Sequence, residues 1–171
     1  MKIEKGKIED INEIMEIIKD TVSDMHEQKI YQWDHTYPSK EIITEDMHEE
    51  NLYVYRDENV IKGFVVLNEY EDKEYEELDW KYNKGRHLVI HRLCVNPKYK
   101  GKGIATKLIE YADIYGRDNN YSAIRLDTFI DNKPARKLYE KKGYSVVGAL
   151  EFRMGVFYCF EKALEPITTY I

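Results

Sequence analysis

The sequence has little cysteine and no long apolar run. Its two cysteines, Cys94 and Cys159, each lie in an apolar stretch, which is too few for a disulfide framework and indicates buried free thiols rather than one bridge. No segment approaches the roughly 20 apolar residues that span a bilayer. Residues 1–14 carry acids throughout and contain no apolar signal core. These absences argue against a membrane protein and predict a cytoplasmic one.

The chain also lacks an excess of positive charge. It has 26 lysines and arginines against 32 acids, a net charge of −6, which argues against nucleic acid as a partner. It has no repeat or low-complexity tract, and 171 residues fit a single domain, 1–171. The histidines show no clustered metal-ligand spacing, so no metal is expected; they are His26, His35, His48, His87 and His91.

The first half predicts two helices followed by strands. Apolar residues at helical spacing favour a helix over residues 11–22, and a second, shorter helix follows at 39–49. Residues 52–56 and 60–68 are rich in β-branched and aromatic side chains, with the turn residues Asp57-Glu58-Asn59 between them, which predicts a hairpin. The acidic stretch 69–86 reads as a mobile connection, and another strand follows at 87–95.

The second half alternates helix and strand. A glycine-rich turn opens a helix from Ile104, and Gly143 stands where a helix-ending glycine belongs. The remaining elements predicted are a strand at 123–127, a short helix at 131–143 and strands at 144–149 and 152–160. Together these elements predict an α/β (α+β) domain with a mixed, largely antiparallel sheet and a central βαβ unit.

The turn at residues 95–106, VNPKYKGKGIAT, carries the clearest chemical signal. A strand runs into a glycine-rich turn and then a helix, whose first amides suit a phosphate. The Walker spacing is absent, and Thr106 stands where the dinucleotide fingerprint needs a glycine. On these residues alone, a phosphate site and a helix-capping turn with surface lysines both stay open.

Two blocks resemble the GNAT superfamily of acetyl-CoA-dependent N-acetyltransferases. Its signature Gln/Arg-x-x-Gly-x-Gly/Ala is matched by Lys100, Gly103 and Ala105, with lysine as a departure that keeps the positive charge. The later pattern, Asn-x-x-Ala-x-x-Leu/Phe-Tyr-Glu-x-x-Gly-Phe/Tyr, is matched at every anchor by residues 132–144.

The resemblance implies a fold and a cosubstrate. The fold is a single GNAT-like domain in which a central parallel strand pair splays apart, flanked by helices. The cosubstrate is acetyl-CoA, with its pantetheine arm along the open strand edge. The residues expected to bind it are Leu93, Cys94, Val95, Lys100, Gly101, Lys102, Gly103, Ile104, Ala105, Thr106, Asn132, Ala135 and Arg136.

The resemblance also implies a general acid. Tyr139 is expected to protonate the leaving thiolate, since a phenol near pKa ~10 and a thiol near ~8.5 are close enough for proton transfer. The alternative is an aromatic ring that packs the short helix. Where relatives place a carboxylate base, this chain has His91-Arg92, so His91 is the candidate base, unless the amine arrives neutral and none is needed.

The acceptor is expected to be a small-molecule or peptide amine. Trp33, Asp34 and Tyr37 precede the hairpin and offer aromatic rings and a carboxylate for an ammonium group, although a loop pinned by a buried tryptophan explains them equally well. The oligomeric state is expected to be a monomer or a homodimer. A different class also stays open: a sensor that binds acyl-CoA without turnover.

Overall fold

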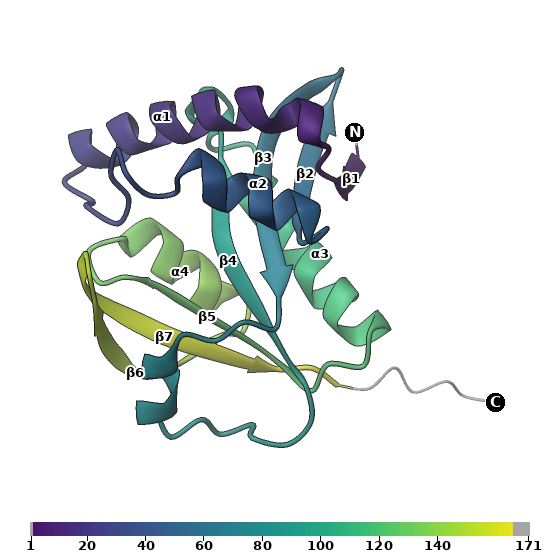
Figure 1. Cartoon of the computed structure of the whole chain (residues 1–171). Helices are drawn as coiled ribbons and strands as arrows, with labels where there is room; N and C mark the ends of the chain where they lie inside the picture. The colour runs from purple at the N-terminus through teal and green to yellow at the C-terminus, as the bar shows by residue number, and fades with distance from the viewer. Residues whose placement is uncertain (1, 166–171) are drawn as a thin grey trace. The chain divides into compact units, whose positions relative to one another are not determined.

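The computed structural model describes residues 2–165, and they form two compact units (Figure 1). The first contains residues 2–67 and 91–108, and the second contains residues 68–90 and 109–165. Strand β4 (His87–Val95) and helix α3 (Ile104–Asp118) each run from one unit into the other.

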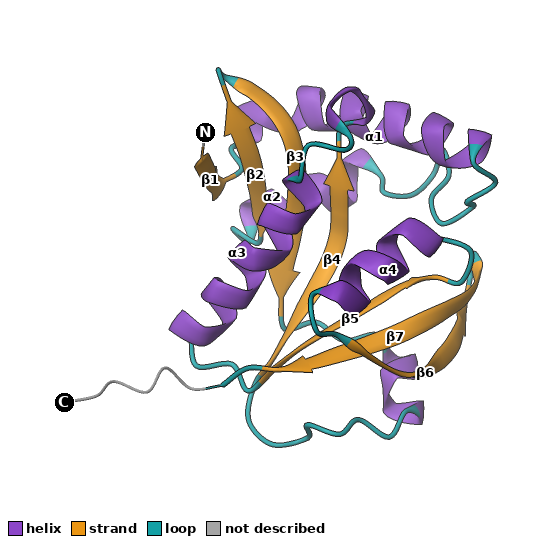
Figure 2. Cartoon of the chain, turned by 180° about the vertical axis from the view of Figure 1, so that it is seen from behind, coloured by secondary structure: helices purple, strands orange, loops and turns teal. Residues whose placement is uncertain are grey.

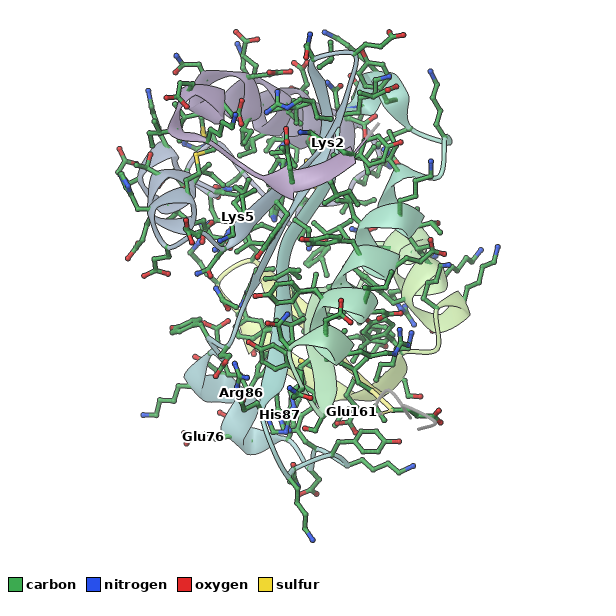
Figure 3. The ribbon with its side chains drawn as sticks, turned by 90° about the vertical axis from the view of Figure 1, so that its right-hand side faces the viewer. Lys2, Lys5, Glu76, Arg86, His87 and Glu161 are labelled. Carbon is green, nitrogen blue, oxygen red and sulfur yellow. The ribbon has the colours of Figure 1, made fainter. Side chains whose placement is uncertain are left out.

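The first unit is built on an antiparallel meander. Strands β1 (Lys2–Lys5), β2 (Leu52–Asp57) and β3 (Val60–Asn68) pair in that order. Asp57 faces Val60, so Glu58 and Asn59 alone make the turn, with φ of 50° and 62°. Positive φ at both central residues is the geometry of a tight hairpin turn, which confirms the predicted hairpin. At the outer edge, β1 carries the exposed Lys2 and Lys5 (Figure 3), and such charges discourage strand addition.

Two helices cover one face of this meander. Helices α1 (Ile11–Glu27) and α2 (Lys40–His48) both lie in front of β2 and β3 in Figure 1 and behind them in Figure 2. The α1 stripe is buried, with Ile14 fully enclosed and packed in one cluster with Phe64. Ser39 Oγ accepts a hydrogen bond from the Ile42 amide (3.3 Å), which caps α2. Both predicted helices are confirmed, and α1 extends to Glu27.

The opposite face of β3 receives the first turn of α3. A Cβ on Gly63 would lie 2.8 Å from the Cys94 carbonyl oxygen, 3.1 Å from Ile104 Cγ2 and 3.3 Å from Leu108 Cδ1. The absence of a side chain therefore lets α3 approach the strand closely.

Gly63→Ala should lower the free energy of unfolding by about 1–3 kcal/mol, because the added methyl group meets a backbone oxygen that cannot rotate away. Urea unfolding would measure the change. Val60→Ala, at a 37% exposed position of the same strand, is the control and should differ little from wild type. Equal urea midpoints for Gly63→Ala and wild type would show that the strand shifts to accommodate the methyl group without loss of stability.

The second unit contains the only parallel pairing among the described strands. Strand β4 pairs with β5 (Ala123–Phe129) over just three positions, His87 to Val89 with Ala123 to Arg125. Along its whole length β5 pairs antiparallel with β7 (Gly155–Ala163), which in turn pairs with β6 (Ser145–Phe152). Helix α4 (Lys133–Lys141) precedes β6. The sheet is therefore mixed and mostly antiparallel, as predicted.

The acidic segment 69–86 is not the mobile connection that its charge predicted. It contains a 3-10 helix, Lys73–Glu77, and both Tyr75 and Trp80 are buried against Leu150 and Cys159. The Trp80 indole donates to the Tyr75 carbonyl oxygen (2.8 Å). The prediction was wrong because aromatic residues between the acids supply the apolar surface that anchors the segment.

A buried acid also holds this segment. The Glu161 carboxylate, on β7, accepts hydrogen bonds from the backbone amides of Lys81 (2.8 Å) and Tyr82 (3.4 Å). Figure 3 shows Glu161 at the same end of the second unit as Arg86 and His87. The segment is thus held to β7 by hydrogen bonds from its backbone amides to the Glu161 carboxylate, as well as by its aromatic rings.

Candidate functional site

The glycine-rich turn lies in the first unit, between β4 and α3. The Asn96 side chain accepts from the Lys98 amide (3.0 Å) and opens the 3-10 helix Pro97–Tyr99. Gly101 and Gly103 follow with φ of 73° and 75°, and nothing lies within 4 Å of a Cβ built on either residue. The backbone is therefore open at both glycines, in a conformation that favours glycine.

The start of α3 presents unpaired amides. Its first helical hydrogen bond runs from the Lys107 amide to the Gly103 carbonyl oxygen (3.1 Å). The amides of Ile104, Ala105 and Thr106 precede that bond and carry the positive end of the helix dipole. Open glycines followed by such amides fit a phosphate group.

The lysines of the turn are not equally available. Lys100, at the position of the family's glutamine or arginine, forms an ion pair with Asp24 of α1. The Lys102 ammonium lies 5.3 Å from the centre of the Tyr99 ring, and Lys62 lies 4.9 Å from the same ring. Lys100 is therefore already paired with an acid, while Lys102 lies beside the open glycines.

The end of β4 leading into the turn contains the half-buried Leu93 and Val95 on either side of Cys94, which is 3% exposed. Its Sγ lies 3.3 Å from Thr21 Oγ1, and burial raises the pKa of the thiol to about 12. Burial also raises the pKa of Cys159 to about 12. Both thiols stay protonated near neutral pH, so neither is a ready nucleophile.

An ion pair lies inside the first unit next to His91. The Arg92 guanidinium donates to both carboxylate oxygens of Asp46, at 2.8 and 2.5 Å, and to the Tyr37 hydroxyl at 3.1 Å. Arg92 has φ of 50°, a left-handed conformation within β4. His91 is half-buried on the same strand. The sequence singled out the pair His91-Arg92 but gave no sign that Asp46 is the arginine's partner.

The predicted acceptor residues have different environments. Trp33 is 4% exposed and belongs to the core under α1 and α2. Asp34 accepts from the Thr36 amide (2.8 Å) and the Tyr37 amide (3.0 Å), which shapes the loop. Tyr37 is half-buried, with its hydroxyl on Arg92. The structure thus brings Tyr37 to the ion pair and encloses the Trp33 ring.

Tyr139 lies in α4 of the second unit and is 6% exposed. Its ring packs against Tyr144 and Phe160, with centroids 6.0 and 5.8 Å away. Burial raises the pKa of the phenol far above its usual value, and the negative charge of Asp127 raises it further. The hydroxyl is therefore always protonated and available as a donor, but it is a weaker acid than a free phenol.

The start of α4 is organised by Asn132. Its side-chain oxygen accepts from the Ala135 amide (3.3 Å) and caps the helix. The Arg136 guanidinium lies 4.2 Å from the centre of the Tyr158 ring and donates from Nη1 to the Ile130 carbonyl oxygen (3.3 Å). Its Nε is buried with no hydrogen-bond partner among the described residues.

The sequence analysis missed Asp127 as a candidate. This carboxylate lies between Leu126 and Thr128 in β5, and its Oδ2 accepts a hydrogen bond from the Tyr75 hydroxyl (2.7 Å). Burial raises its pKa to about 6. The available signal was a lone acid in the predicted strand, but Tyr75, 52 residues away, could not be recognised as its partner.

Residues 2–165 show neither a metal-binding cluster nor a membrane-spanning helix. They contain no group of three or more histidine, cysteine, aspartate or glutamate residues that could hold a metal ion. None of their helices is long and apolar enough to cross a membrane.

Comparison with known proteins finds similarity to acetyltransferases. The profile of the Acetyltransferase (GNAT) family matches residues 12–144. Streptothricin acetyltransferase of Escherichia coli is 37% identical over 59 residues, 34% of this chain and 34% of that protein. The L-amino acid N-acetyltransferase AaaT of E. coli K12 is 35% identical over 66 residues, 36% of this chain and 39% of that protein.

The similarity to solved structures extends over the whole fold. A protein of Staphylococcus aureus Mu50, provisionally described as an acetyltransferase, has a TM-score of 0.77 and 30% identity. The match covers 96% of this chain and 100% of that one. The curated relatives, in contrast, are matched over less than two fifths of their own length.

Proposed function

Because the chain belongs to the GNAT family of acetyltransferases, we propose that it transfers the acetyl group of acetyl-CoA to a primary amine by direct attack. The observation that carries the proposal is the turn at Gly101 and Gly103, where open backbone meets the unpaired amides of α3. That arrangement fits the pyrophosphate of CoA. When bound, acetyl-CoA supplies an activated thioester carbonyl.

We assign the predicted cofactor residues to three groups. The turn and the first residues of α3 hold the pyrophosphate, with charge from the lysines; they are Lys100, Gly101, Lys102, Gly103, Ile104, Ala105 and Thr106. The backbone of Leu93, Cys94 and Val95 binds the pantetheine arm and donates to the thioester oxygen. Asn132, Ala135 and Arg136 stay proposed as further cofactor contacts.

Direct attack by the amine is consistent with the protonation states of the two cysteine thiols and of Tyr139. Both cysteines are held protonated by burial, which disfavours an acetyl-cysteine intermediate. The amine nitrogen attacks the carbonyl once it is neutral, with His91 as the proposed proton acceptor. Tyr139, protonated at every working pH, then donates its proton to the leaving thiolate.

The acceptor is proposed to be a small-molecule or peptide amine. The names of the two curated relatives specify streptothricin and L-amino acids as their acceptors, and both are small amines. Asp34 and Tyr37 stay proposed as acceptor contacts, whereas Trp33 would act only by supporting their loop. A single domain, 1–171, acting in the cytoplasm as a monomer or homodimer, completes the proposal.

CoA and acetyl-CoA should stabilise the protein thermally, while NAD and ATP should not. A ligand at about 100 times its Kd adds about 2.7 kcal/mol, which a thermal-shift assay detects easily. Equal stabilisation by ATP would contradict the CoA site. Release of free thiol from acetyl-CoA over a panel of amines then separates an enzyme from a sensor that binds without turnover.

Gly103→Val should abolish the shift caused by CoA. A β-branched side chain disfavours the φ of 75° and fills the space in which the ligand would lie. Gly143→Val is the matched control, because Gly143 has φ of 86° but lies outside the turn. It should lose stability yet keep its response to CoA. A normal CoA shift in Gly103→Val would remove the turn from the proposed site.

A further inference from the structure

The second unit contains a half-buried carboxylate with no cationic partner among the described residues. Asp127 faces Cys159 across the β5–β7 ladder, and this part of the sheet is covered by Tyr75 and Trp80 of the acidic segment. The carboxylate accepts one hydrogen bond, from Tyr75, and its side chain stays partly accessible to solvent. An ionised carboxylate in such surroundings is costly unless a cation is paired with it.

No positively charged side chain among the described residues pairs with Asp127. The groups that act on its charge are the Tyr75 hydroxyl and the carboxylate of Asp72, which adds repulsion. Arg125 precedes it by two residues on β5, but its guanidinium donates to Glu71 (2.8 Å) and to the Tyr82 carbonyl oxygen (3.0 Å) and lies 4.3 Å from the centre of the Trp80 ring. Arg125, the nearest arginine along the strand, is therefore already bound to other groups.

We propose that Asp127, fixed by Tyr75, binds the ammonium group of the acceptor amine and takes up its proton, in place of His91. The inference rests on the proposed acetyl transfer and specifies its acceptor as a cationic amine. It also explains why the acidic segment is anchored, since Tyr75 is then a positioning residue that occupies Oδ2 and leaves Oδ1 to the ammonium group.

The proton balance is complete. The ammonium group forms a charge-assisted hydrogen bond to the carboxylate, its N–H bond breaks, and an O–H bond forms on Asp127. The nitrogen lone pair is then free to attack the thioester carbonyl. Asp127 returns its proton to solvent before the next turnover. Because the charge of Asp127 raises the pKa of Tyr139, protonation of Asp127 also makes Tyr139 a stronger acid at the moment a proton is needed.

The assignment predicts a particular pH profile. Only the carboxylate form accepts a proton, so kcat/KM should fall as the pH drops through about 6, the pKa to which burial raises Asp127. Asp72 and burial raise this pKa, whereas the hydrogen bond from Tyr75 lowers it. Tyr75→Phe keeps the ring and removes that hydrogen bond, so the acid limb should move to higher pH. A role of Tyr75 in packing alone would not move it.

The test uses the whole chain and a simple cation. In NMR spectra of the labelled protein, n-butylammonium should shift the backbone amides of β5 around Asp127, while the neutral n-butanol should not. Asp127→Asn should abolish these shifts and should lower kcat/KM for the best amine of the panel by ~100-fold or more. Glu151→Gln, an exposed acid on β6 of the same unit, is the matched control and should change neither result.

Two further measurements distinguish failure of this inference from failure of the proposed function. Burial makes the folded protein hold the Asp127 proton more tightly than the unfolded chain does, so stability is lost as the pH rises from 3.8 to about 6. Asp127→Asn should therefore raise the melting temperature at pH 8, which confirms that the variant folds. Wild-type activity retained by Asp127→Asn, or amide shifts retained in it, overturns this inference alone. A wild-type protein that ignores CoA overturns the proposed function instead.

Discussion

Replacement of Tyr139 by phenylalanine should lower kcat by roughly 10²–10⁴-fold, the range for a positioned general acid. The substitution removes one hydroxyl and keeps the ring that packs against Tyr144 and Phe160. Both kcat and kcat/KM should fall together, because donation to the thiolate matters only in the transition state. Affinity for CoA and the melting temperature should change little. Steady-state kinetics and a thermal-shift titration would measure these quantities.

Tyr144→Phe is the matched control for this experiment. Tyr144 is 3% exposed in the same unit, and its hydroxyl donates to Asp113 (3.0 Å). Its loss should reduce stability and leave kcat unchanged. Near-normal turnover of Tyr139→Phe in a chemistry-limited assay would show that Tyr139 only packs the helix. Unfolding or loss of CoA binding would show instead that it is a structural or binding residue.

The raised pKa of Tyr139 refines the expected chemistry. A phenol close to its ordinary pKa would match a thiol well, whereas the buried phenol holds its proton more tightly. Complete transfer to a free thiolate would then be uphill, so the proposed donation would occur while the C–S bond breaks and would be easier when a cation neutralises Asp127.

Local signals predicted most of the fold. Three local features could be read from residue spacing, because each acts within a few residues. They are the apolar stripe around Ile14 and Ile18, the hairpin turn Glu58-Asn59, and the glycines of the glycine-rich turn. Element ends were less accurate: α1 continues to Glu27 because polar residues extend a helix without adding to its stripe. The sequence also predicted the candidate cofactor residues through two contiguous blocks.

Pairs between distant residues could not be predicted in this way. Asp46 and Arg92 are 46 residues apart, and Tyr75 and Asp127 are 52 apart. Each partner alone reads as an ordinary surface charge or aromatic residue, because only the folded chain removes both from water. The structure of the acidic segment 69–86 was predicted wrongly for the same reason. Its charges are visible in the sequence, whereas the burial of Tyr75 and Trp80 depends on strands far along the chain.

Asp46→Asn should lower the free energy of unfolding by about 3–5 kcal/mol, the cost of leaving one member of a buried ion pair alone. Asp46 is 5% exposed, and both of its carboxylate oxygens accept from Arg92. The ion pair also holds Arg92, whose φ is 50°, in a left-handed conformation. Loss of the pair should therefore let the backbone at Arg92 relax. Urea unfolding at neutral pH would measure the change.

The control is the same substitution in a partly exposed ion pair of the same unit. Asp57 bonds Lys62 at 2.7 Å with both side chains partly in water, so Asp57→Asn should cost only about 0–1 kcal/mol. The double variant Asp46→Leu with Arg92→Met should recover much of the loss, because the penalty comes from the unpaired charge rather than from the missing attraction. If Asp46→Asn costs no more than Asp57→Asn, water reaches Arg92 and the pair is not buried. If the double variant is as unstable as Asp46→Asn, the loss arises from packing around α2 instead of charge.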